Sequence, residues 1–333
     1  GGKQSMKTKI IAGAGAILLI AVLLVVLRPA SFTSTLQKQV DKMDGYVLKG
    51  DMEISKGENL KTYALEVGYH KGDVQQFKVS LTDKELNQEQ QILKNKDGVF
   101  VITPSLNQIF KFEGDWPLNT PKPYLLQTMN DIVQQKDTKI KKEKEGYLIS
   151  AKVNYPSSQS YHHEDMHFDK DGKIQWLQIY NEDNVVELKI VFNKVEYNTN
   201  FEKDYFKTPT TLEKEKSTSA IAEEDLPLYP VQVFSSKLEN TSVVSSGGET
   251  RHILEYSGDK DFTVIETKKK ASDETQTVIM PLDMMDSMEL IGFYDGSHMS
   301  VMYDNVEFSV YSEDLEPEEM MDVISSMQVA VMK

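Results

Sequence analysis

Residues Met166 to Pro209 decide the fold, and they read MHFDKDGKIQWLQIYNEDNVVELKIVFNKVEYNTNFEKDYFKTP. Alternating apolar and polar residues predict strands at His162–Phe168, Ile174–Tyr180 and Val186–Tyr197. Short polar turns at 169–172 and 181–184 join these strands. Long strands linked in sequence by tight turns form an antiparallel meander, so this stretch predicts a curved antiparallel sheet.

The same pattern extends toward the N-terminus. Lys96-Asp97-Gly98 predicts a hairpin turn, because Asp-Gly suits the positive φ angles of two-residue turns. Apolar residues at helical spacing predict helices at Ser31–Met43 and Tyr124–Gln135. Further strands are predicted at Tyr46–Ile54, Lys61–Tyr69, Gln76–Leu81, Glu89–Lys94, Val99–Thr103, Ile109–Phe112, Thr138–Lys142 and Tyr147–Val153.

A polar linker separates this region from a second one. Residues 210–226 are rich in Thr, Glu, Lys and Ser, a composition typical of linkers. We therefore predict one domain at 31–209 and a small antiparallel α+β domain at 227–333, free to move independently. Its last element is a helix from Glu313 to Met327 capped by Ser312. Its strands are predicted at Val231–Phe234, Thr241–Val244, Ile253–Tyr256, Phe262–Thr267, Thr275–Pro281, Glu289–Tyr294, His298–Tyr303 and Val306–Tyr311.

An apolar run near the N-terminus predicts a membrane anchor. Residues Ile10–Leu27 read IIAGAGAILLIAVLLVVL, and eighteen residues of helix reach roughly 27 Å, close to the hydrocarbon thickness of a bilayer. Three lysines among residues 1–9 precede the run, which places that end in the cytoplasm. We predict a cytoplasmic tail at 1–9 that begins with a cloning remnant, and an uncleaved anchor at 10–28; a cleaved signal peptide is the alternative.

Composition excludes several classes of function. The 333 residues carry 52 acidic and 37 basic side chains, for a net charge of -15, which disfavours nucleic acid as a partner. The absence of cysteine excludes disulfides, thiol catalysis and a lipidated cysteine. No G-x-S-x-G motif or phosphate-binding loop is present. We therefore predict a protein that is not an enzyme and has no cofactor.

His162, His163, Glu164 and His167 contain residue types that bind metals. Alternate residues of a strand lie on one face roughly 7 Å apart. This strand alone therefore cannot supply enough ligands to bind a single metal ion. We predict an exposed polar strand and no metal site.

A family resemblance can be read from these motifs. The strand ending in Asp169, the DxDG-like turn, the two following strands and the closing Phe-x-x-Pro resemble the lipoprotein-carrier (LolA-type) fold, as does KNKDGVFVITPSLNQIFKF at Lys94–Phe112. The resemblance covers residues 36–209. The C-terminal half, with YSGDKDFTVIETKK and SEDLEPEEMMDVISSM, is similar to domains of the clostridial and bacillar germination and sporulation lipoprotein group. This chain departs from that group by lacking the lipidated cysteine.

The resemblance implies a mainly β, α+β fold: a curved antiparallel half-barrel with helices on its concave side, followed by the small second domain. A concave face of this kind either encloses an apolar cavity or is filled as core. Alternation along the strands places these candidates for cavity lining on it: Phe77, Val79, Val101, Ile149, Trp176 and Leu188.

Two functions follow from the resemblance. The first is a membrane-tethered, extracytoplasmic binding protein that docks or activates a cell-envelope protein, such as a peptidoglycan amidase of the spore cortex, in sporulation or germination. The second is a local carrier that binds an acyl chain or lipoprotein in the apolar cavity. Either way we expect a single-pass protein of the forespore or mother-cell membrane, with most of its mass outside the cytoplasm.

Overall fold

The computed structural model describes residues 31–56, 58–113, 121–156, 158–213, 219–281 and 283–328. The predicted tail at 1–9 and anchor at 10–28 lie outside these ranges. Within them, no helix has the length and apolar character needed to cross a bilayer.

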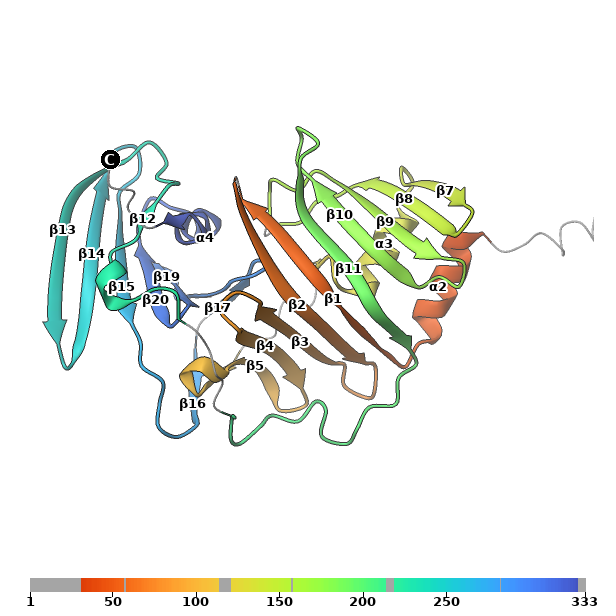
Figure 1. The fold of residues 1–333 in the computed structure, drawn as a ribbon, viewed down its shortest axis with the longest axis horizontal. Helices are drawn as coiled ribbons and strands as arrows, with labels where there is room; N and C mark the ends of the chain where they lie inside the picture. The colour runs from red at the N-terminus through yellow and green to blue at the C-terminus, as the bar shows by residue number, and fades with distance from the viewer. Residues whose placement is uncertain are drawn as a thin grey trace, which may run out of the picture.

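A curved 12-stranded sheet forms the larger part of the molecule (Figure 1). Its strands follow the order β16-β6-β5-β4-β3-β2-β1-β11-β10-β9-β8-β7, and all neighbours are antiparallel except β16 and β6. The predicted meander and the Asp97-Gly98 hairpin are confirmed, with Asn95 paired to Gly98 across the turn. The strands are β1 (Gly45–Lys56), β2 (Asn59–His70), β3 (Gln76–Asp83), β4 (Gln88–Asn95), β5 (Gly98–Thr103), β6 (Gln108–Phe112), β7 (Lys139–Glu143), β8 (Gly146–Lys152), β9 (His163–Asp169), β10 (Ile174–Tyr180), β11 (Val186–Tyr197) and β16 (Gln276–Met280).

Two short helices pack on the concave face of this sheet, as the sequence predicts. Helix α2 (Phe32–Lys42) starts at Ser31, whose hydroxyl accepts a hydrogen bond from the Ser34 amide. Its Phe32 ring stacks on Tyr147 of β8, with centroids 4.4 Å apart. Helix α3 (Leu126–Gln134) is tied to β1 by Tyr46, whose hydroxyl accepts from the Leu126 amide and donates to the Gln127 side chain.

A second, seven-stranded sheet follows in the order β13-β14-β15-β20-β19-β18-β17, and α4 (Pro317–Ser325) packs on it against β19 and β20. A two-stranded ribbon pairs β12 (Tyr229–Pro230) with β21 (Met327–Gln328). The seven strands are β13 (Lys237–Ser246), β14 (Glu249–Ser257), β15 (Phe262–Lys268), β17 (Asp283–Asp286), β18 (Ile291–Tyr294), β19 (His298–Tyr303) and β20 (Val306–Tyr311); single 3-10 turns lie at Pro104–Leu106 and Glu223–Asp225.

Strand β16 joins the first sheet, so its predicted place in the second sheet is wrong. Residues Gln276 to Met280 pair in parallel with Gln108 to Phe112 of β6. The chain then crosses the concave face, where Phe293 packs 5.5 Å from Phe110 and 5.3 Å from Phe112, between ring centroids. Sequence periodicity predicts that 276–280 is a strand, but it carries no information about the partner that the strand finds.

The C-terminal helix begins later than predicted. Ser312 Oγ accepts hydrogen bonds from the Asp314 and Leu315 amides, but the helix starts at Pro317, with Glu316 as its cap. The Glu316 amide donates to the Glu319 carboxylate, a reciprocal capping interaction. Proline at the first helical position explains the later start, since its fixed φ suits that position.

The segment after β11 packs on the convex face. Phe201, Tyr205, Phe206 and Leu212 contact a small apolar cluster formed by Leu93, Phe100, Ile102 and Ile109. The Asn95 side-chain amide donates to the Phe206 carbonyl and to the Thr208 hydroxyl. In the described part of the predicted linker, the Ala220 and Ile221 amides donate to the Asp304 carboxylate. The segment after β11 therefore contacts the first sheet with residues 201–212 and the second sheet with residues 220–221.

The side-chain alternation of β10 changes face at a β-bulge. The register shifts between Ile174 and Trp176, so Ile174 and Leu177 both point into the core. Trp176 instead stacks on His167 on the convex side, with ring centroids 5.9 Å apart. Its predicted place on the concave face is wrong, because alternation counted from Ile174 ignores the extra residue.

We expect Leu177→Ala to lower the free energy of unfolding by about 2–5 kcal/mol, because it opens a cavity among fully buried side chains. The neighbouring Trp176→Ala removes only a surface stack and should cost about 1 kcal/mol. Urea denaturation of both variants measures the difference. Equal losses would mean that Trp176 is a core residue after all.

Candidate functional site

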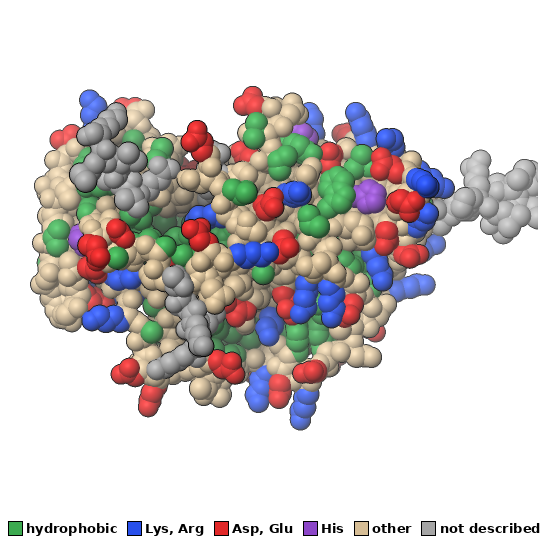
Figure 2. Space-filling view, viewed as in Figure 1, with side chains coloured by type: hydrophobic (Ala, Val, Ile, Leu, Met, Phe, Trp, Pro, Cys, Tyr) green, Lys and Arg blue, Asp and Glu red, His purple; other side chains and the backbone are tan. Residues whose placement is uncertain are grey.

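A groove runs between α4 and the first sheet. It consists of two adjoining cavities of about 340 and 510 Å³, which share Ile54, Glu289, Asp322 and Ser325 as lining residues. The end of the β1–β2 hairpin forms one wall and α4 forms the other. Figure 2 shows hydrophobic side chains within the hollow between the C-terminal part at the left and the first sheet at the right. A volume of this size is typical of ligand and peptide sites.

The floor of the groove is apolar because the two hydrophobic cores meet there. Ile54 and Met288 belong to the core of the first sheet, and Leu228 and Ile324 belong to the core of the second. Val231 lies on the lip and keeps 64% of its surface exposed. An exposed valine beside buried apolar residues gives the groove a surface that a partner side chain can cover.

The groove is acidic. Lys61 is the one basic residue among the lining residues that the structure describes, and it donates to the Tyr303 hydroxyl over 3.0 Å. Burial is the main cause of the raised pKa of Tyr161, and the negative charge of Glu289 adds to it. The carboxylates that line the groove are Glu187, Asp286, Glu289, Glu318, Glu319 and Asp322.

A buried ion pair fixes the inner end of the groove. Lys122 lies 3.1 Å from the Asp286 carboxylate, and the two side chains expose only 1% and 4% of their surface. The Lys122 ammonium also donates to the Asp286 carbonyl over 2.8 Å. Burial raises the pKa of Asp286, and the Lys122 charge opposes that rise. The pair joins the segment before α3 to the segment that enters the core from β17.

A second buried carboxyl holds the floor residue Leu228 in place. Glu266 of β15 has no exposed surface, and its Oε2 accepts a hydrogen bond of 2.8 Å from the Leu228 amide. Burial raises the pKa of Glu266 to about 8. The carboxyl is therefore protonated over most of the physiological pH range, which avoids a buried charge beside apolar residues.

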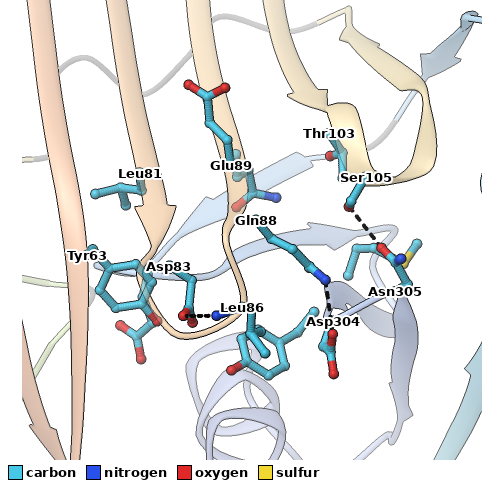
Figure 3. A pocket seen from close by; sticks show the side chains of 14 residues that line it. Tyr63, Leu81, Asp83, Leu86, Gln88, Glu89, Thr103, Ser105, Asp304 and Asn305 are labelled. Carbon is cyan, nitrogen blue, oxygen red and sulfur yellow. Dashed lines mark hydrogen bonds between the residues drawn. The ribbon is translucent and has the colours of Figure 1, made fainter. Parts of the chain in front are cut away.

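Hydrogen bonds across the seam hold the β19–β20 turn against the first sheet (Figure 3). The Gln88 side chain donates to Asp304 over 3.0 Å, and Ser105 donates to Asn305 over 2.8 Å. The space in this seam measures only about 60 Å³. The β19–β20 turn is therefore packed closely against the first sheet here.

Most of the predicted cavity-lining residues are brought together, but as core. Five of them have between 0% and 4% of their surface exposed and belong to one continuous cluster. A space beside Val79 measures about 10 Å³, which is at the lower limit for one water molecule. In this conformation, α2, α3 and the segment 288–293 fill the concave face. The five residues are Phe77, Val79, Val101, Ile149 and Leu188.

The histidine-rich strand β9 is polar on one face only. His163 stacks on Tyr180 with centroids 4.7 Å apart, while Glu164 points into the core and accepts from the Tyr155 hydroxyl over 2.7 Å. Burial raises the pKa of Glu164 to about 8. The prediction that this strand is an exposed polar one is therefore wrong at Glu164, a polar residue in an inward register position.

Sequence reasoning missed the groove itself. Its walls come from Ile54, from Tyr161 and from α4, which are far apart along the chain. The one available signal was the run Met284–Ile291, where carboxylates and methionines alternate irregularly before an apolar strand.

These features define an α+β, mainly β protein in which two sheets share a groove. No family model matches the sequence. The chain is 29% identical over 300 residues to the sporulation protein YdcC of Bacillus subtilis, with 88% of each chain covered, and this confirms the resemblance to sporulation proteins read from the sequence.

Solved structures also match parts of the chain. The complex of the CwlD amidase with the GerS lipoprotein from Clostridioides difficile gives 14% identity and a TM-score of 0.30, covering 51% of this chain and 98% of that chain. A LolA superfamily protein, NE2245 from Nitrosomonas europaea, gives 11% identity and a TM-score of 0.28, covering 54% and 99%.

We expect Lys122→Met to lower the free energy of unfolding by about 3–5 kcal/mol near neutral pH, because it leaves the Asp286 carboxylate buried without its cation. The pKa of Asp286 then rises further, so the loss should shrink as the pH falls and the carboxyl takes up a proton. The double variant Lys122→Met/Asp286→Asn should recover most of the loss. Denaturation at pH 4.5 and 7.5 tests this, and a loss that is equal at both pH values contradicts it.

Glu266→Gln should flatten the dependence of stability on pH. The pKa of Glu266 in the folded state, about 8, lies above the ordinary glutamate value of 4.5, so between these two pH values the folded state holds one proton more than the unfolded state. The contribution of Glu266 to the free energy of unfolding is therefore fully present below pH 4.5. It falls as the pH rises toward 8, by up to about 1.4 kcal/mol per pH unit. As the pH rises over this range, the free energy of unfolding of Glu266→Gln should increase relative to that of the natural chain. The exposed control Glu202→Gln should show the same pH dependence as the natural chain. Parallel curves for all three chains would contradict the assignment.

Proposed function

We propose that this protein is a membrane-tethered, extracytoplasmic binding protein of sporulation or germination, and that its groove docks a segment of a cell-envelope protein. The observation that carries the proposal is the groove between α4 and the first sheet, with its apolar floor and acidic walls. The similarity to a sporulation protein supports the setting. The apolar run at 10–27, preceded by lysines, supports the tether.

The shape of the groove suits an extended segment. Two adjoining cavities that share four lining residues form one continuous groove, and an extended chain places alternate side chains about 7 Å apart on one face. Apolar side chains of the partner would cover Ile54, Val231 and Met327. Backbone and polar groups would remain at the rim, as in other interfaces.

Charge selects the kind of segment. The described lining residues include six carboxylates and one lysine, and two of the carboxylates form ion pairs, Asp286 with Lys122 and Glu319 with Lys260. Glu318 on the exposed side of α4 has room to meet a partner cation. The occupant is therefore a segment that combines Lys or Arg with apolar side chains.

The concave face supports this choice over an acyl carrier. The side chains that would line an acyl cavity are packed against α2, α3 and Phe293. An acyl chain would have to displace these contacts, at a cost of several kcal/mol for the buried apolar surface. The groove needs no such rearrangement.

We expect a fluorescent eight-residue peptide of alternating Lys and Leu to bind the protein, and its Glu-Leu counterpart to bind at least about tenfold more weakly, equal to about 1.4 kcal/mol. Glu318→Lys should weaken binding of the Lys-Leu peptide about five- to tenfold. The matched change Glu202→Lys, on the convex face, alters the net charge equally and should leave the affinity within about twofold. Fluorescence anisotropy at low and physiological salt measures these affinities. Equal binding of both peptides, or equal effects of both variants, would sink the proposal.

The cellular role is tested by complementation. Sporulating cells that lack the protein receive the natural chain, Glu318→Lys or Glu202→Lys at matched amounts. We expect Glu318→Lys to reduce the yield of germination-competent spores and Glu202→Lys to restore it. Full restoration by Glu318→Lys would mean that the groove is not the docking site.

A further inference from the structure

Strand β13 is a sheet edge unlike the other three in the two large sheets. Within the described residues it pairs with β14 on one side only, and it is ten residues long. Edge β7 carries Lys139, Lys141 and Lys142 in its five residues, and edges β16 and β17 have five and four residues. Proteins protect their edges with lysine or by keeping them short, because an edge offers unpaired backbone groups to another strand. β13 has neither protection along most of its length.

The side chains of β13 favour strand pairing. All of its residues except Ser242 are exposed, including Leu238, Val243 and Val244 with 40%, 56% and 48% of their surface accessible. A bulge between Leu238 and Asn240 leaves 240–246 as a regular stretch. This stretch, NTSVVSS, has no charge and no proline, and its valines and threonine have high β-propensity. A long, uncharged, exposed edge is a template for another strand.

We propose that two copies of this chain associate by antiparallel pairing of their β13 strands across a two-fold axis. A two-fold contact uses the same surface on both copies and closes on itself, so it yields a dimer and not a fibre. The two seven-stranded sheets would then continue into one. β13 lies at the end of the molecule opposite α2, so neither the groove nor the N-terminal side blocks the approach (Figure 1).

Charge along the strand fits a second copy. The only charged residues of β13 are Lys237 and Glu239, near one end. Antiparallel pairing centred on Ser242 places Glu239 opposite Ser245 and Lys237 opposite Gly247. Centring on Val243 instead places Glu239 opposite Gly247, in the turn that follows β13. No register centred on residues 241–243 sets like charges opposite each other, which would destabilise the pair.

The net charge of -15 acts against association at long range. Since salt screens this repulsion and leaves backbone pairing intact, higher salt should strengthen the dimer. An ionic contact between copies would show the opposite trend.

The full chain in detergent, followed by sedimentation equilibrium, tests the proposal. We expect a monomer–dimer equilibrium whose dissociation constant falls as salt rises. Val243→Lys/Val244→Lys should raise that constant at least about tenfold, since it adds the lysine protection seen at β7. The matched control Val185→Lys/Val191→Lys changes one exposed valine in the turn before β11 and one on β11, which are 55% and 44% accessible, and should dimerise like the natural chain.

A cross-linking measurement keeps the test independent of folding effects. The chain has no cysteine, so Ser242→Cys places one thiol on the proposed axis, where paired Cα atoms lie about 4.5–5.5 Å apart, within disulfide range. Thr241→Cys and Val243→Cys cover the neighbouring registers. At least one of the three should form disulfide-linked dimers under mild oxidation far faster than Val185→Cys. A monomer at all salt concentrations, equal loss in both lysine pairs, or no preference for β13 cysteines would overturn the proposal.

Discussion

The fold depends on covering the concave face of the 12-stranded sheet. Eleven strand spacings of about 4.8 Å span roughly 50 Å, while α2 and α3, with 11 and 9 residues, reach about 16 and 14 Å. Two helices of that length leave the β3–β6 half of the face exposed. The segment 288–293, which includes the first residues of β18, closes this gap with Met288, Ile291 and Phe293, all of which lie in the first core. The C-terminal part is thus a structural requirement of the first sheet.

This constraint also creates the groove. Where the chain leaves the first core to build the second sheet, two apolar surfaces meet at an angle and cannot fill the corner between them. Lys122 and Asp286 fix that corner by pairing where both side chains are almost fully buried, a geometry in which either partner alone would be costly. The groove is consequently shaped by residues that also hold the two sheets together, and its position relative to the sheets is fixed.

The sequence predicts the elements far better than their partners. Period-two alternation, apolar residues at helical spacing and the Asp97-Gly98 turn are local signals. Strands β1 to β11 and both concave-face helices were therefore predictable. The place of β16 beside β6 depends on pairing across more than 160 residues of sequence. At the β10 bulge, one inserted residue moves the Trp176 side chain to the opposite face of the sheet. Alternation predicted that five of the candidate lining residues point inward, but it did not distinguish a filled core from an open cavity. The groove required three distant segments to meet. Buried Glu164 and Glu266 were hidden because a single carboxyl in an alternating pattern reads as a solvent-facing residue.

The groove and the β13 edge are physically separate surfaces, which matters for how each acts. The groove is formed by α4 and the ends of the first sheet, and β14 and β15 lie between β13 and the strand against which α4 packs. A partner segment in the groove would therefore contact α4 without touching the edge strand. Because β13 buries almost none of its own side chains in the core, its pairing with a second strand would add backbone hydrogen bonds without repacking the protein. A dimer paired through β13 would thus carry two grooves, one on each copy, and a partner with two basic segments would gain affinity from engaging both.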